Sequence, residues 1–444
     1  MTTITVCYLR AGRVIDGPAV RAAIWNIMDL LNILKCRLEI VDDGVTTNRL
    51  IDELVSFGPL EASVHLTELD KVVKRHYQWI RHLPVVHPFY TVRNNNDLRI
   101  LGTTVLLDCG YVCTSKSEVL QVLELGVDPE WILLKSAAGN DELLKFARRK
   151  RLLLAFNNEQ DLRNIHHFYP EAELLISFEY EADPFLEHDS HIRTHELLNL
   201  AKELELDVIG WTFNSTPRHT NHNAVFEIIR KGREITDFAL IVGFDFNFIN
   251  LGSSCSEHHD QDLVQYSIEV NRALQEFFPD SRQFTIVAES GAFHCAPAVT
   301  TVSTVNGKRV FWHPEFPSQI DKVYYYLNHD VGESSAVVKP IIWKDPRNCG
   351  MICNSNLYAS SNKCLVENVP LPEVNEMDSL VFENQGSSNS SAMDSPIFPI
   401  TLTVIRKSMW HFLETLSISE NPRRFIFNSQ YLSRETKIER LKFD

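Results

Sequence analysis

The sequence contains no run of about eighteen consecutive apolar residues, so it predicts no membrane-spanning helix. The N-terminus also lacks the short charged start and clean apolar segment of a signal peptide, because Arg21 and Asp29 interrupt the helical stretch at Val20–Leu34. The nine cysteines are scattered and odd in number. Together these absences predict reduced thiols and a cytoplasmic location.

Positive charge is the scarcer sign in this chain. There are 43 Lys and Arg residues against 58 Asp and Glu, which gives a formal net charge of −15. This balance disfavours binding to nucleic acid or to an anionic membrane. The 44% apolar and 23% charged composition is that of an ordinary globular protein, and 444 residues are too many for one compact core, so we expect two domains.

The sequence also lacks the usual spacing of a zinc site. Two pairs of cysteines are separated by three residues rather than the two of a zinc knuckle: Cys109 with Cys113, and Cys349 with Cys353. Three histidines would share one face of a helix: His188, His191 and His195. Because the chain has 17 histidines, chance clustering explains this group, and we predict no metal.

Short apolar runs alternate with amphipathic helical stretches beyond about residue 63. The predicted strands are Pro88–Val92, Thr104–Leu107, Trp131–Leu134, Leu152–Phe156, Leu174–Phe178, Asp207–Phe213, Phe246–Leu251 and Phe284–Glu289. The predicted helices between them are Lys116–Leu125, Asp141–Lys150, Glu159–His167, Glu196–Leu204, Ala224–Gly232 and Asp260–Phe278. Eight strands alternating with helices over roughly 230 residues are typical of a (β/α)8 TIM barrel.

After Ala298 the segments become short, β-rich and separated by turn residues, as in "RVFWH" and "KVYYYLN". This pattern predicts an antiparallel β domain. The predicted organisation is therefore an N-terminal extension (1–35), a segment joining the β domain (36–68), the barrel (69–299), the C-terminal β domain (300–404) and a C-terminal tail (405–444).

Two charged residues stand where predicted barrel strands end. Arg93 follows the apolar run "PFYTV", and Glu289 ends the strand "FTIVAE". The carboxyl ends of barrel strands are where such folds carry their chemistry. A strand-end carboxylate can equally be a structural cap or ion-pair partner.

The strand "FINLG" ends where a phosphate-binding loop would begin, but glycines do not follow it. Ser253 and Ser254 come directly after Gly252, and their Cβ atoms would crowd a phosphate. The acidic Glu257 and Asp260 would repel one. An ordinary loop is the better interpretation.

One dense basic run, "ARRKR" at Ala147–Arg151, interrupts the acidic chain. It falls at the end of a predicted helix, where cations complement the helix dipole. The run is therefore either a solvated helix end or a contact for an acidic protein partner.

The order of several segments resembles that of eukaryotic ornithine decarboxylases. These segments include "LPVVHPFYTVRNNND", "GFDFNFINLG", "IVAESG", "KVYYYLN" and "LPEVNEMDSLVFENQG", and the resemblance extends over about Leu38 to Ile400. The chain is thus similar to the fold-type III, alanine-racemase-like decarboxylases that use pyridoxal phosphate, and to their antizyme-inhibitor relatives. The resemblance implies a pyridoxal-phosphate-binding barrel followed by a C-terminal β domain.

The family's cofactor positions are altered in this chain. The lysine that forms the Schiff base in "PFYAVKCN" aligns with Arg93, and a guanidinium cannot form that imine. The phosphate loop "LDIGGGFPG" is "INLGSSCSE", which keeps only Gly252. The motif "EPGR" is "ESGA", so Glu289 remains while Ala292 replaces the phosphate-gripping arginine.

The remaining family positions differ as well. The ring-stacking histidine aligns with Asn214, and the aspartate of "FDCASK" with Val112. The tyrosine after "FENMGA" falls near Ser388. The motif "CDGLD" keeps its cysteine as Cys353, but its two aspartates align with Asn354 and Leu357. Because each lost charged contact costs about 1.5–3 kcal/mol, the resemblance implies a pseudoenzyme that has lost pyridoxal phosphate.

Inactive members of this family act as antizyme inhibitors, which occupy antizyme and so release active ornithine decarboxylase. The family's antizyme-binding segment aligns with Lys135–Leu162. The segment contains a set of cations that we expect to meet an acidic partner: Lys145, Arg148, Arg149, Lys150 and Arg151. The resemblance therefore predicts a regulator of polyamine biosynthesis that binds antizyme.

Two alternatives remain open. The chain could be a regulatory subunit of an active ornithine decarboxylase, since family active sites lie across a dimer interface. The lysine–aspartate pair of that interface falls on His191 and Leu357, which favours a monomer or a weak dimer. An active decarboxylase that makes putrescine would need a Schiff-base lysine, and none aligns with the family position.

Overall fold

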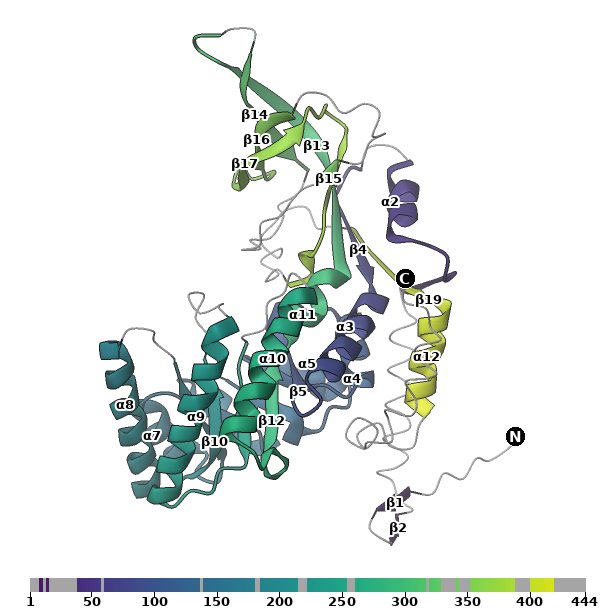
Figure 1. Cartoon of the computed structure of the whole chain (residues 1–444). Helices are drawn as coiled ribbons and strands as arrows, with labels where there is room; N and C mark the ends of the chain where they lie inside the picture. The colour runs from purple at the N-terminus through teal and green to yellow at the C-terminus, as the bar shows by residue number, and fades with distance from the viewer. Residues whose placement is uncertain are drawn as a thin grey trace. The chain divides into compact units, whose positions relative to one another are not determined.

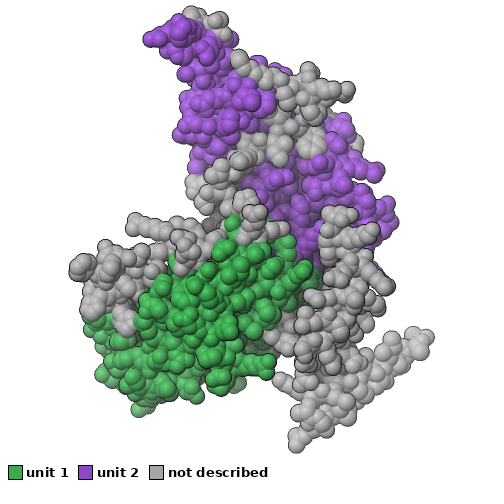
Figure 2. Space-filling view, in the orientation of Figure 1, with its two compact units in different colours: residues 1–34, 75–290, 412–444 green, residues 35–74, 291–411 purple. Residues whose placement is uncertain are grey.

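A computed structural model describes twelve ranges of the chain (Figure 1). These ranges are residues 8–10, 13–15, 38–56, 60–135, 139–179, 184–214, 222–253, 260–316, 319–328, 341–342, 352–387 and 400–418. The chain divides into two compact units, coloured separately in Figure 2. Unit 1 contains residues 75–290, and unit 2 contains residues 35–74 and 291–411. The predicted helical stretch at Val20–Leu34 lies outside the described residues.

Unit 1 is a closed barrel of eight parallel strands, as the sequence predicts. The strands are β5 (His87–Thr91), β6 (Gly110–Cys113), β7 (Ile132–Leu134), β8 (Leu153–Phe156), β9 (Glu173–Phe178), β10 (Asp207–Phe213), β11 (Phe248–Asn250) and β12 (Thr285–Glu289). Each strand pairs with the next in the sequence, and β12 closes the ring by pairing with β5. The carboxyl ends of all eight strands therefore meet at one end of the barrel.

Helices alternate with these strands (Figure 1). They are α4 (Leu98–Leu106), α5 (Lys116–Glu124), α6 (Asp141–Lys150), α7 (Glu159–Phe168), α8 (Pro184–Glu203), α9 (His222–Val242) and α10 (Asp260–Phe277). Helix α6 shows why such segments begin and end where they do. The Asn140 side chain caps it by accepting a hydrogen bond from the Leu143 N–H (3.0 Å), and Arg151 ends it in a left-handed conformation, with φ of 55°.

One predicted strand is wrong. Residues Thr104–Leu106 are the last residues of helix α4, and Leu107 is its C-cap. The second barrel strand is β6, which begins at Gly110. The β-branched run "TTV" favours a strand locally, but Asp97 caps a helix that buries Ile100 and Leu101. Packing of this apolar helix face outweighs the local propensity.

The inside of the barrel is filled by apolar side chains from its strands. The innermost cluster consists of Phe89, Val112, Leu133, Leu153, Ala155, Leu175, Phe248 and Val287. Phe89 and Phe248 meet edge to face, with ring centroids 6.1 Å apart. Val112, which the sequence resemblance aligns with an aspartate, is part of this apolar filling.

Unit 2 contains a nine-stranded sheet, so the predicted β domain is present. Its strands are β3 (Leu38–Val41), β4 (Val64–Glu68), β13 (Val299–Trp312), β14 (Ile320–Leu327), β15 (Ile341–Ile342), β16 (Ile352–Tyr358), β17 (Cys364–Pro372), β18 (Ser379–Phe382) and β19 (Ile400–Arg406). The sheet is mixed rather than purely antiparallel: β13 pairs antiparallel with β4, β14 and β18, whereas β19 runs parallel to β3 and β4, and β14 to β16.

The remaining described elements are α2 (Thr47–Ser56), α3 (Leu69–His82), the short α11 (Gly291–Cys295), α12 (Lys407–Ile418) and the paired strands β1 (Tyr8–Arg10) and β2 (Arg13–Ile15). Segments far apart in the sequence are joined in unit 2 by Arg406, at the end of β19. Its guanidinium donates to Glu68 (2.9 Å), to Asp70 (2.8 Å) and to the Val45 carbonyl oxygen (2.9 Å). Burial opposes ionisation of both carboxyls; it raises the pKa of Asp70, whereas Lys71 and Arg406 lower the pKa of Glu68.

No helix within the described ranges is both long enough and apolar enough to cross a membrane. The cysteines within those ranges are free thiols: Cys109, Cys113, Cys295, Cys353 and Cys364.

Candidate functional site

The carboxyl ends of the barrel strands carry a layer of polar side chains just above the apolar filling. Side chains alternate along a strand, so residues two positions after an inward-facing residue also face inward. Leu133, Phe248 and Val287 belong to the apolar cluster, and two residues after them come Lys135, Asn250 and Glu289. We call the set Lys135, Thr212, Asn250 and Glu289 the mouth layer.

The mouth layer is held together by an ion pair across the barrel. Lys135 Nζ donates a hydrogen bond to Glu289 Oε1, and the two side chains are 16% and 8% exposed. Lys135 follows β7, where its N–H continues the strand ladder to the Cys113 carbonyl oxygen (2.9 Å), and Glu289 ends β12. In the ring, β5 and β6 lie between these two strands. The pair therefore crosses the interior instead of joining adjacent strands.

Asn250 completes this network. Its Nδ2 donates to Glu289 Oε1 (3.1 Å) and to Thr212 Oγ1 (2.9 Å), while its Oδ1 accepts from the Gly252 N–H (3.0 Å). Thr212 and Asn250 are buried. Each of these buried polar groups has a partner within the layer, as stable burial requires.

Arg93 is not part of the mouth layer. It lies in a short 3-10 turn, Val92–Asn94, directly after β5, and it is exposed. Among the described residues its guanidinium has no hydrogen bond or ion pair. The cation that meets Glu289 is therefore Lys135 and not Arg93.

Gly252 is required by its own packing. Its φ of +68° is the left-handed region, and a Cβ at this position would lie 2.3 Å from the Phe213 carbonyl oxygen. The close approach to the end of β10 explains a glycine here without any phosphate. The next residue, Ser253, is exposed, and Ser254 lies outside the described residues.

Two further aligned positions lie in unit 1 and at the start of unit 2. Asn214 follows β10, and its Nδ2 is 3.4 Å from Glu179 Oε1. Ala292 is buried in α11, where its methyl group offers neither charge nor hydrogen bond. Asn214 thus lies beside an acidic side chain, and Ala292 contributes only to packing.

The positions aligned with "CDGLD" all lie on β16 of unit 2. Cys353 and Leu357 are buried in that unit's apolar cluster, and burial raises the pKa of the Cys353 thiol. Asn354 is exposed, with its amide 3.5 Å from Asn368 Oδ1. The side chain of His191 and the whole of Ser388 lie outside what the structure describes.

The basic run lies on α6 and at its end, and its four cations are exposed, as is Lys145 just before it. Two of them already have acidic partners: Lys145 bonds to Glu142 (2.8 Å) and Arg148 to Glu171 (2.6 Å). For Arg149, Lys150 and Arg151 no side-chain hydrogen bond or ion pair exists within the described part of the chain. These three are the cations open to an external partner.

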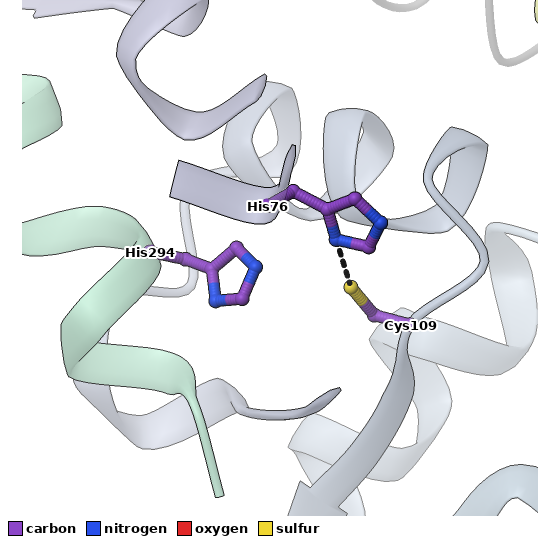
Figure 3. A group of neighbouring side chains, drawn as sticks. All are labelled: His76, Cys109 and His294. Carbon is purple, nitrogen blue, oxygen red and sulfur yellow. Dashed lines mark hydrogen bonds between the residues drawn. The ribbon is translucent and has the colours of Figure 1, made fainter. Parts of the chain in front are cut away.

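A buried thiol–imidazole contact lies elsewhere in unit 1, between His76 of α3 and Cys109, which precedes β6 (Figure 3). His76 Nδ1 is 3.6 Å from Cys109 Sγ. Burial raises the pKa of the Cys109 thiol well above its usual value. His294, also drawn, belongs to unit 2.

The histidine group considered from the sequence is described only in part. His195 stacks on Phe238, with ring centroids 3.6 Å apart, while the side chains of His188 and His191 lie outside the described set. Stacking accounts for His195 without a metal. The prediction of no metal remains a prediction.

Residues 69–296 match the family model described as "Pyridoxal-dependent decarboxylase, pyridoxal binding domain". The chain belongs to this family. The sequence resemblance to ornithine decarboxylases and antizyme inhibitors is therefore confirmed at the level of the family.

Individual relatives include decarboxylases and antizyme inhibitors. Ornithine decarboxylase of Rattus norvegicus is 26% identical over 408 residues, which cover 85% of this chain and 88% of the relative. Antizyme inhibitor 1 of Pongo abelii is 26% identical over 412 residues, which cover 86% and 92%. Arginine decarboxylase of Paramecium bursaria Chlorella virus, solved with agmatine, has the same fold, with a TM-score of 0.71 and 24% identity over 81% of this chain and 100% of that one.

Lys135 is the residue that sequence reasoning missed. It entered only as the first residue of the segment aligned with antizyme binding, yet it lies in the mouth layer. The available signal was the strand "WILLK", in which a lysine stands two residues after an inward-facing leucine. Its partner could not be read from the sequence because 154 residues separate the two.

Proposed function

We propose that this protein is a catalytically inactive member of the ornithine decarboxylase family that binds antizyme. The single observation that supports the loss of catalysis is the position of Lys135 and Arg93 at the carboxyl end of the barrel. Arg93 stands where the family has its imine-forming lysine, and Lys135 is bound to Glu289. An ammonium held in an ion pair has no free lone pair with which to attack an aldehyde.

The residues present also do not fit the phosphate of pyridoxal phosphate. Such a phosphate needs close backbone N–H groups or fixed cations. Gly252 packs against the Phe213 carbonyl oxygen. Ser253 carries a side chain that would crowd a phosphate, and Ala292 has no charge to bind one. We therefore propose that the family cofactor is not held, and we assign no reaction step to it.

The comparisons support a regulatory role of the kind that the name antizyme inhibitor describes. Antizyme inhibitor 1 is as similar to this chain as ornithine decarboxylase is, at 26% identity in each case. Its name says that it inhibits antizyme, and we propose the same partner for this protein. The consequence would be release of ornithine decarboxylase from antizyme in the cytoplasm, and hence more polyamine synthesis.

We place the proposed antizyme contact at the end of α6. The candidate residues are Lys145, Arg148, Arg149, Lys150 and Arg151. Because Lys145 and Arg148 already bond to Glu142 and Glu171, the other three would carry most of the attraction to an acidic face.

The alternative is a regulatory subunit of an active ornithine decarboxylase. Family dimers need a charged residue where this chain has Leu357, and Leu357 is fully buried in the apolar cluster of unit 2. This favours a monomer or a weak dimer. A pull-down with tagged protein distinguishes antizyme binding from this alternative. We expect the tagged protein to retain antizyme without ornithine decarboxylase. Retention of the decarboxylase alone would favour the alternative.

A third reading, an active decarboxylase, is tested by release of carbon dioxide from ornithine, lysine and arginine in the presence of pyridoxal phosphate. We expect none from purified protein. Turnover above the uncatalysed rate would contradict the proposal whatever the antizyme result.

A further inference from the structure

The ion pair in the mouth layer needs a physical explanation beyond stability. Removing a carboxylate and an ammonium from water costs several kcal/mol for each ion, and a well-packed apolar pair is often at least as stable. Lys135 and Glu289 nevertheless form an ion pair across the barrel interior, and both side chains are little exposed. Glu289 also accepts from Asn250, so the layer is arranged around its carboxylate.

The parts of this network differ in how they are held. Glu289 ends a strand, and its N–H donates to the Gly252 carbonyl oxygen (2.9 Å). Asn250 is fixed at both ends of its amide, by Thr212 and Gly252. Lys135, in contrast, reaches the carboxylate through four flexible methylene groups from the far side of the ring. The acceptor side is rigid and the cation is supplied by a flexible side chain.

We infer that Glu289 and Asn250 form a binding site for a primary ammonium group, and that the chain's own Lys135 occupies it. The mouth of the barrel is thus closed by an internal ligand. The inference concerns the barrel alone and does not depend on antizyme binding.

The inference also predicts what the site would accept once it is emptied. Lys135→Ala keeps Cβ and removes three methylene carbons and the ammonium, which together are the atoms of n-propylammonium. The truncated barrel would then contain a buried, rigid carboxylate with a vacancy of that shape. A small primary alkylammonium ion should enter and bond to Glu289, whereas a tetraalkylammonium ion has no N–H to donate.

The test is thermal unfolding of the full chain carrying Lys135→Ala, with and without n-propylammonium chloride. We expect a lower melting temperature than wild type, and a saturable rise of about 3–5 °C at roughly tenfold excess over the dissociation constant. Tetramethylammonium chloride at the same concentration should give no such rise. A melting temperature that responds equally to both salts, or to neither, would overturn the inference.

Two variants control for the chemistry. Lys135→Ala with Glu289→Gln should lose the response to n-propylammonium, because the carboxylate is gone. Lys202→Ala should not respond either, since the Lys202 ammonium bonds to the Gly243 carbonyl oxygen (3.1 Å) on an exposed helix rather than to a buried carboxylate. A response in either control would attribute the effect to general salt binding.

A second measurement keeps the inference testable if the alanine variant does not fold. Lys135→Met retains a side chain of similar length without the charge, so Glu289 is left without a cation. We expect Lys135→Met to melt below wild type, and Lys135→Met with Glu289→Gln to recover most of the loss. Equal melting of wild type and Lys135→Met would show that Glu289 needs no ammonium, and would refute the inference.

Discussion

Arg148 of α6 donates to Glu171, which follows α7, at 2.6 Å. The next three residues of the chain, Arg149, Lys150 and Arg151, are also exposed but have no such partner within the described residues. This difference divides the basic run into a cation that is used within the barrel unit and three that are open to solvent. It decides which substitutions test the proposed antizyme surface.

Reversing the three open cations should weaken antizyme binding. We expect Arg149→Glu, Lys150→Glu and Arg151→Glu together to reduce affinity by at least about 2 kcal/mol, through slower association and through repulsion by an acidic partner. Added salt should weaken the wild-type complex as well. Binding kinetics at two salt concentrations measure both effects. Thermal unfolding should show only a modest loss of stability, because the exposed cations stabilise the fold mainly through the dipole of α6.

A matched control carries the same change of charge elsewhere. Arg81, Arg193 and Arg282 are exposed, and in the described structure they too have no side-chain hydrogen bond or ion pair. Reversing them to Glu should leave antizyme affinity near the wild-type value. If both triple variants weaken binding equally, only net charge matters, and the end of α6 is not the contact.

Restoring the family lysine should not restore catalysis. We expect Arg93→Lys to give no aldimine absorbance with pyridoxal phosphate and no carbon dioxide from ornithine. We propose that Ser253 and Ala292 would still leave the cofactor phosphate without its contacts, and Lys135 would still bond to Glu289. An aldimine band in this single variant would show that Arg93 alone prevents cofactor binding.

Arg406 should be essential to the stability of unit 2. Removing its charge leaves Glu68 and Asp70 buried without their shared cation, so we expect Arg406→Met to lower the free energy of unfolding by about 3–5 kcal/mol. The neighbouring Lys407 pairs with Asp42 in full exposure, and Lys407→Met should change stability little. Chemical denaturation of both variants measures the difference, and equal effects would contradict the role given to Arg406.

His87 should contribute to acid sensitivity. Burial lowers the pKa of its imidazole to about 4, below the ordinary 6.5, so the folded protein keeps it neutral where the unfolded chain is protonated. Its contribution to stability is therefore present above pH 6.5 and is lost as pH falls towards 4. We expect His87→Gln to reduce the loss between these pH values by about 2 kcal/mol.

Unfolding measured from pH 7 to pH 4 tests this directly. The exposed His167 provides the control, because His167→Gln should leave the pH dependence of wild type unchanged. Parallel curves for wild type and His87→Gln would show that other groups account for the acid sensitivity.

The fold was largely predictable from the sequence because strand and helix periods are local. Asp207–Phe213 and Asp141–Lys150 were predicted with the bounds that β10 and α6 have. The strand predicted at Thr104–Leu107 failed because helix capping by Asp97 and packing of α4 outweighed β-branched composition. The same limit applies to the candidate site. Glu289 was predicted from its place at a strand end, which is a local pattern. Lys135 was not predicted, because its contact with Glu289 forms only when the barrel closes.

The central claim is that this protein binds antizyme and does not decarboxylate ornithine. The most direct measurement titrates purified protein into a preformed complex of antizyme with ornithine decarboxylase and follows decarboxylase activity. The account predicts that activity rises as the protein displaces the enzyme, while the protein alone shows none. No release of activity at micromolar protein, with no binding to free antizyme, would contradict it.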